Sequence, residues 1–131
     1  LKKGAYVLWE SSDLDPDIIL IGTGSEVEIV LAAGEKLAKE NIKVRIISMP
    51  SCELFENQSK EYKESVLPDS CDKRIVVEAG TSFGWEKYVG RKGKMICKND
   101  FGASAPYGVL LEEFGFTIKN VYKKAKELLE L

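Results

Sequence analysis

The stretch IGTGSEVEIV, residues 21–30, joins two segments of different periodicity. Before it, Ile18 to Gly22 is a continuous apolar run, which is typical of a strand covered on both faces of a sheet. After it, apolar residues recur at helical spacing from Val27 to Ala38, and Asn41 follows as a residue that tolerates a left-handed helix end. A strand that passes through a glycine turn into a helix predicts an α/β fold.

The two glycines of this turn raise the question of a nucleotide site. A dinucleotide fingerprint needs a third glycine and an acidic residue about 20 positions further on. Val27 stands where the third glycine would be, and the next predicted strand ends in Ser48, Met49 and Pro50 without a carboxylate. A Walker-type loop is excluded because no Gly-Lys-Ser/Thr follows.

The start of the helix carries its own capping residues. Ser25 and Glu28 match a capping box, in which each side chain bonds a free backbone N–H of the first turn. Glu26 adds a second acidic group there. Because a bound phosphate would use the same N–H groups, we predict that the turn is structural.

The rest of the chain continues to alternate strand-like and helix-like segments. Strands are predicted at residues 5–9, 18–22, 43–49, 74–79 and 95–98, and helices at residues 25–41, 51–68, 83–90, 104–114 and 117–131. This alternation predicts a mostly parallel sheet covered by helices on both sides, with the leading strand as an antiparallel edge. The length of 131 residues fits one domain spanning residues 1–131.

Composition narrows the classes of partner. The formal net charge is −2, so neither nucleic acid nor an anionic membrane surface is favoured as a partner. The longest apolar runs are far below the roughly 18 residues of a membrane span, and the start lacks the apolar centre of a signal peptide. We therefore expect a cytoplasmic protein. The chain begins at Leu1 without a methionine, and we expect it to be a piece cut at a domain linker.

The residue types available for chemistry are few. The sequence has no histidine, which removes Ser-His-Asp and Cys-His nucleophile pairs and histidine-ligated zinc. Its three cysteines, Cys52, Cys71 and Cys97, are odd in number and show no CxxC spacing, so we expect unpaired thiols. The sequence therefore predicts no catalytic residue, no cofactor-binding residue and no metal ligand in this chain.

Two sets of residues are candidates for contact with another molecule. The carboxyl ends of parallel strands border the ligand crevice of such sheets, although capping of the next turn explains an isolated Glu78 better than a catalytic role does. Clustered aromatic residues without surrounding basic residues favour a hydrophobic contact to another domain or subunit. The crevice set is Thr23, Gly24, Ser25, Ser48, Glu78 and Ser82, and the interface set is Phe83, Trp85, Tyr88, Phe101, Pro106 and Tyr107. The lysines at 119, 123, 124 and 126 are predicted to form a solvated helix face.

Six segments in collinear order together resemble the C-terminal domain of transketolase. They are IGTGSEVEIVLAAGEKLA (21–38), VRIISMPSCELFENQ (44–58), ESVLP (64–68), VVEAGTSFGWEKYVG (76–90), FGASAP (101–106) and EEFGFTIKNVYKKAKELL (112–129). The resemblance covers nearly the whole chain. One departure is Glu86, where we expect many relatives to carry histidine or another residue, so no role is assigned to it.

The resemblance implies a three-layer α/β/α sandwich with a five-stranded sheet, four strands parallel and one edge strand antiparallel. It also implies two further domains upstream, in a homodimer that transfers a two-carbon ketol unit between sugar phosphates. Thiamine diphosphate and magnesium are expected to be bound by those other domains, with this chain supporting packing and dimerisation and inactive alone.

Two alternatives stay open at this stage. The chain could be a small-ligand-binding or regulatory module that uses the crevice at its strand ends. It could also be the equivalent domain of another thiamine enzyme, such as deoxyxylulose phosphate synthase or the first component of pyruvate dehydrogenase. FGASAP followed by EEFGFT favours transketolase over both enzymes.

Overall fold

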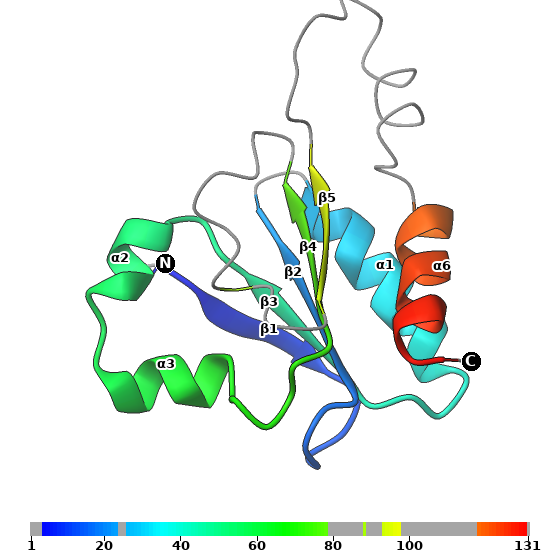
Figure 1. The fold of residues 1–131 in the computed structure, drawn as a ribbon, viewed down its shortest axis with the longest axis horizontal. Coiled ribbons are helices and arrows are strands. Elements are labelled where there is room, and N and C mark those ends of the chain that lie inside the picture. The colour runs from blue at the N-terminus through cyan, green and yellow to red at the C-terminus, as the bar shows by residue number, and fades with distance from the viewer. Residues whose placement is uncertain (1–3, 24–25, 79–87, 89–92, 98–117, 131) are drawn as a thin grey trace, which may run out of the picture.

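The computed structural model describes residues 4–23, 26–78, 88, 93–97 and 118–130 (Figure 1). Its strands are β1 (Tyr6–Glu10), β2 (Ile18–Gly22), β3 (Val44–Ser48), β4 (Arg74–Glu78) and β5 (Lys94–Cys97). Its helices are α1 (Val27–Ala38), α2 (Cys52–Glu56), α3 (Lys60–Val66) and α6 (Ile118–Leu128). The predicted helices at 83–90, apart from residue 88, and at 104–114 lie outside the described residues.

The strands form one mixed sheet in the order β1-β3-β2-β4-β5. β1 runs antiparallel to β3, and the pairs β2–β3, β2–β4 and β4–β5 are parallel. The predicted α/β class and the antiparallel direction of the leading strand are confirmed. β2 lies between β3 and β4, so the chain leaves this central strand on one side and returns on the other.

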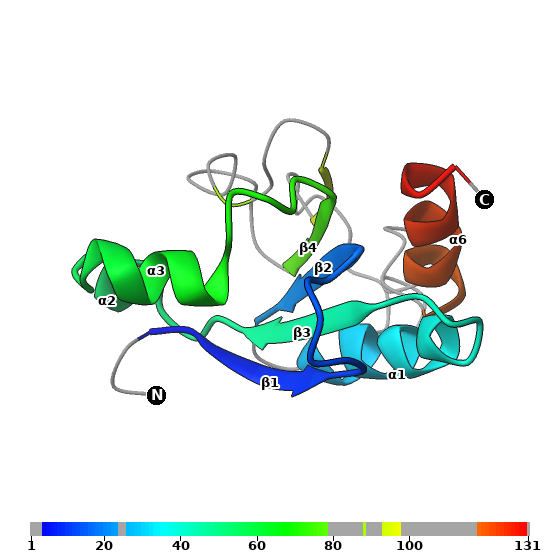
Figure 2. The same cartoon turned by 90° about the horizontal axis from the view of Figure 1, so that it is seen from below.

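Side chains of the central strands alternate between two cores, because successive residues of a strand point to opposite faces. Even-numbered β2 residues, Ile18 and Leu20, pack with α1 and α6, while Ile19 and Ile21 pack with Phe55 of α2 and other residues of the opposite face. Figures 1 and 2 show α1 with α6 and α2 with α3 on opposite sides of the strands. All five β2 residues are buried, as the continuous apolar run predicted.

The segment predicted as one helix at 51–68 is two helices, so that prediction is wrong. Ser51 and Ser59 each end an extended stretch, and each hydroxyl accepts a hydrogen bond from a backbone N–H three residues on, at 3.2 Å and 3.1 Å. Serine competes in this way with a continuing helix and favours an N-cap. Ser59 therefore starts a new helix inside the apolar periodicity.

The glycine turn has a packing role. A Cβ at Gly22 would lie 2.9 Å from both the Val27 Cα and the Val30 Cγ2, closer than side chains tolerate, so only glycine lets α1 start against β2. The N-cap of α1 is Glu26, which makes no side-chain cap bond, and its N–H donates to the Thr23 carbonyl at 3.0 Å. The predicted capping box depends on Ser25 and stays a prediction. Ser25 lies outside the described residues. Asn41 adopts φ 64°, the left-handed end predicted for it.

Candidate functional site

Three residues of the predicted crevice come together where the central strands end. Thr23 follows β2, while Ser48 and Glu78 are the last residues of β3 and β4. The Thr23 hydroxyl donates to the Glu78 carboxylate at 2.7 Å, across the point where the chain crosses from one side of β2 to the other. Gly24, Ser25 and Ser82 lie outside the described residues. The juxtaposition of the other three was predicted from topology alone.

A fourth polar residue at this edge was missed as a site residue. Glu26 is only 3% exposed, and Thr23 and Ser48 are buried beside the same strand ends. The signal available in the sequence was an acidic residue in the first helical turn, which the helix dipole stabilises. Thr23, Glu26, Ser48 and Glu78, the described residues of this crevice, include no basic side chain that could bind a phosphate.

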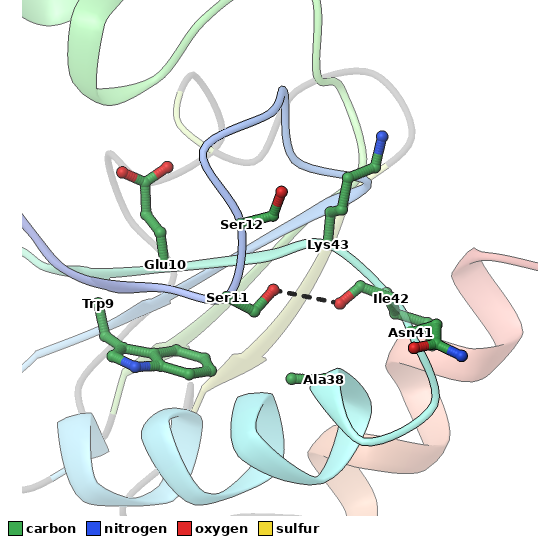
Figure 3. A pocket seen from close by; sticks show the side chains of 8 residues that line it. All are labelled: Trp9, Glu10, Ser11, Ser12, Ala38, Asn41, Ile42 and Lys43. Carbon is green, nitrogen blue, oxygen red and sulfur yellow. Dashed lines mark hydrogen bonds between the residues drawn. The ribbon is translucent and has the colours of Figure 1, made fainter.

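A cavity of about 530 Å³ lies at the opposite edge of the sheet (Figure 3). Its lining comes from the end of β1, the end of α1 and the start of β3: Trp9, Glu10, Ser11, Ser12, Ala38, Asn41, Ile42 and Lys43. Figure 3 shows the indole of Trp9 above α1 and the Ser11 hydroxyl turned toward Ile42. We name it the Trp9 cavity.

The polar groups of the Trp9 cavity are engaged in the fold. The Ser11 hydroxyl donates to the Ile42 carbonyl at 3.3 Å and accepts from the Val44 N–H at 2.9 Å. Glu10 pairs with Arg45 at 3.0 Å, and Lys43 lies 3.9 Å from Asp17. The Ser11 and Glu10 contacts join the end of β1 to β3, and the Lys43–Asp17 pair joins the segments before β3 and β2, so these groups form no nucleophile with an adjacent base.

A buried arginine lies on the side of the sheet that α2 and α3 cover. Arg74, the first residue of β4, is 7% exposed. Its guanidinium donates only to backbone carbonyls among the described residues: those of Cys71 at 2.9 Å, Tyr88 at 3.1 Å, Pro68 at 2.8 Å and Leu67 at 3.4 Å. The planar guanidinium offers several donors in a fixed geometry, and here it ties the residues after α3 to Tyr88.

Tyr88 is a correction to the predicted interface. It is 4% exposed, and its ring packs against that of Phe55 with the centroids 5.9 Å apart. Burial, and then the neighbouring Glu56, raise the pKa of the Tyr88 phenol far above its usual value. Because this ring packs inside the domain, it is not available for contact with another domain or subunit. The other five residues of the interface set lie outside the described residues.

The thiols behave as small apolar groups. Cys71 is buried, Cys52 is half-buried, and neither forms a disulfide. Burial raises the pKa of the Cys71 thiol, which disfavours the reactive thiolate. Among the described residues there is no group of three acidic, cysteine or histidine side chains that could hold a metal ion. None of the helices in that part of the chain is long and apolar enough to span a bilayer.

Comparisons with known proteins agree with one another. A family model described as "Transketolase-like TK C-terminal domain" matches residues 4–117. A chloroplastic transketolase of Craterostigma plantagineum is 57% identical over 98% of this chain and 25% of its own length. The solved transketolase of Leishmania mexicana has a TM-score of 0.85 at 38% identity and covers 98% of this chain and 18% of that one.

A solved transketolase of Pichia stipitis in complex with sedoheptulose 7-phosphate gives a TM-score of 0.84 at 36% identity. It likewise covers 98% of this chain and 18% of that chain. The matched relatives include chloroplastic and bacterial transketolases. This chain spans about a fifth of the length of the curated relatives that it matches.

Proposed function

Because the chain belongs to the transketolase family and corresponds to its C-terminal domain, we propose that it serves a larger enzyme as a packing and dimerisation domain. In this role it supplies no catalytic residue. The observation that carries the proposal is the commitment of its polar groups to the fold. Thr23 bonds Glu78, Ser11 bonds the start of β3, and Arg74 bonds four carbonyls.

The enzyme that contains this domain is proposed to transfer a two-carbon ketol unit between sugar phosphates. The sedoheptulose 7-phosphate in the Pichia stipitis relative supports this class of substrate. Such chemistry needs groups that hold and move protons, and the complete absence of histidine from this chain argues that they reside elsewhere.

Thiamine diphosphate and magnesium are proposed to bind to the other domains of that enzyme. The described residues of this chain do not fit them. The described residues of the crevice at the strand ends include no basic side chain for a diphosphate, and among the described residues no group of three acidic, cysteine or histidine side chains could hold a cation. No step of the reaction is therefore assigned to residues of this chain.

The architecture proposed for residues 1–131 is a single three-layer α/β/α domain with five strands. Cores on both faces of the sheet support it. Its partners are proposed to be the other domains and the second subunit of a homodimer, contacted through five aromatic or proline side chains. They are Phe83, Trp85, Phe101, Pro106 and Tyr107. A cytoplasmic location stays a prediction, since relatives include chloroplastic proteins.

The proposal is tested by measuring ketol transfer and assembly separately. We expect the chain alone to convert no sedoheptulose 7-phosphate when supplied with an aldose phosphate acceptor, thiamine diphosphate and magnesium. Added to a relative truncated before its own C-terminal domain, the chain should restore dimerisation as measured by light scattering after size exclusion. Turnover by the chain alone, or no effect on assembly, would contradict the proposal.

The strand-end crevice supports a second candidate function, a small-ligand-binding module. Its motivation is the convergence of Thr23, Ser48 and Glu78 at one edge. With two carboxyl groups nearby, the ligand should be a neutral polyol rather than a nucleotide or sugar phosphate. Calorimetric titration with free and phosphorylated sugars decides this, and no heat up to roughly millimolar concentrations for any of them ends this candidate.

A further inference from the structure

The outer surfaces of α1 and α6 form a further concave surface, separate from the strand ends and from the Trp9 cavity. The two helices lie side by side (Figures 1 and 2), and α6 turns Val121 and Ala125 into the core. Between them is a cavity of about 390 Å³, which we name the α1–α6 groove. It is lined by Lys36, Lys119, Tyr122, Lys123, Lys126 and Glu127.

The groove concentrates positive charge on a chain that is acidic overall. Four ammonium groups line it with one carboxylate, Glu127, and a second carboxylate, Glu40, borders it. Lys119 and Lys123 are exposed, in line with the solvated lysine face predicted for α6. Lys36 comes from α1, 83 positions before Lys119 in the sequence, so no local pattern could show that these lysines share one groove.

The bordering carboxylate is already engaged. Glu40 accepts hydrogen bonds from the Lys126 ammonium and from the Tyr122 hydroxyl. Those two bonds, the one from Lys126 first, lower the pKa of the Glu40 carboxyl. Among the described residues, no carboxylate forms an ion pair with Lys119 or Lys123, and both side chains are exposed. Two ammonium groups of the groove are therefore available to an anion.

The floor of the groove is apolar. The ring of Tyr122 lies in the lining, with the Lys36 Nζ 4.4 Å and the Lys126 Nζ 5.6 Å from its centroid. Lysine keeps its ammonium in water while its four-carbon stem covers apolar surface. The result is a ring and aliphatic stems below a rim of positive charge. Such a surface complements a molecule that is apolar at one end and anionic at the other.

We propose that the α1–α6 groove binds a small amphipathic organic anion, with its apolar body on Tyr122 and its charged group between Lys119 and Lys123. The volume of the groove lies at the low end of the roughly 300–1,000 Å³ of ligand pockets, which fits an aromatic body of up to three rings. Carboxylate, sulfonate and phosphate headgroups share the required charge. The proposal does not depend on the activity of the larger enzyme.

The test uses 8-anilinonaphthalene-1-sulfonate, a two-part aromatic anion, as the fluorescent probe for the full chain at low ionic strength. We expect saturable binding with one probe per chain. K119E/K123E should weaken binding by at least about tenfold, because each attraction becomes a repulsion. The matched control is K39E/K60E, which makes the same change of charge at two exposed lysines outside the groove and should change the affinity less than about twofold.

Two further measurements locate the headgroup and the body. Competition by 2-naphthoate, but by neither 2-naphthol methyl ether nor inorganic phosphate alone, is expected if both parts of the ligand are needed. Amide chemical shifts should move for α1 and α6 residues in the chain and not in K119E/K123E. Equal affinities of the two double variants, displacement by phosphate alone, or shifts confined to other elements would each overturn the proposal.

Discussion

Replacement of Arg74 by methionine tests whether a buried guanidinium holds the far side of the sheet together. Arg74 donates four hydrogen bonds, three of them between 2.8 and 3.1 Å. Methionine fills much of the same volume but leaves these carbonyls without their donor. A hydrogen bond to a charged group contributes roughly 1.5–3 kcal/mol, and an orphaned buried group costs about 1–3 kcal/mol.

The full sum of these bonds overstates the loss, for two reasons. Removing the guanidinium also removes the cost of burying a charge, and water in the adjoining cavity of about 300 Å³ can reach part of the site. We therefore expect Arg74→Met to lower the free energy of unfolding by about 3 kcal/mol. For a domain of this size that corresponds to a fall of roughly 10–15 °C in Tm.

Urea denaturation followed by circular dichroism measures this change, and an unchanged slope ensures that the comparison concerns stability. Lys43→Met is the control, since it removes an exposed ion pair with Asp17 and should cost no more than about 0.5 kcal/mol. Arg74→Lys keeps the positive charge but lacks the planar set of guanidinium donors, so its loss in free energy of unfolding should lie between those of the other two variants. If Arg74→Met and Lys43→Met destabilise equally, the carbonyls do not depend on Arg74 and the reasoning is wrong.

Three further predictions concern the packing and the ion pairs. Gly34→Val should lower the free energy of unfolding by about 1–3 kcal/mol in urea denaturation, because a Cβ there would lie 2.5 Å from the Ile46 Cδ1; no loss would mean that α1 can shift. Thr23→Val should cost about 1–2 kcal/mol in the same assay through the lost bond to Glu78, and an unchanged midpoint would refute it. The lowered pKa of Glu40 stabilises the fold above its usual value of 4.5, and this contribution is lost as the pH falls below it. The Tm difference between the chain and Glu40→Gln should accordingly be present at pH 7 and shrink as the pH falls below 4.5 toward the lowered pKa of Glu40.

Local signals in the sequence predicted the parts of the fold that local physics decides. Continuous apolar runs predicted β2, β3 and β4, and period 3.6 predicted α1 and α6. The break between α2 and α3 was missed because Ser59 sits within an unbroken apolar stripe, and only its cap bond to Tyr62 reveals a new helix start. A serine three residues before such a stripe is nevertheless a readable signal.

Predicting the sites was harder than predicting the helices and strands, because the sites depend on contacts between residues far apart in the sequence. Topology sufficed to bring Thr23, Ser48 and Glu78 to one edge, because the ends of parallel strands coincide. It could not show that Arg74 would be buried, since a charged residue at a strand start is normally exposed and its carbonyl partners come from a loop. Nor could it show the α1–α6 groove, which needs the register between two helices far apart in the sequence.

The glycine turn shows why a phosphate-like pattern is weak evidence for a phosphate. Gly22 is required by the approach of Val27 and Val30, whether or not a ligand is present. The glycines therefore report on the packing of a helix against its strand. What decides the chemistry is the occupant of the helix N-terminus, where a phosphate and a carboxyl group compete for the same favourable potential. In this chain the N-cap of α1 is Glu26, which is buried and makes no side-chain cap bond. The packing of α1 against β2 therefore explains the glycine without reference to a ligand.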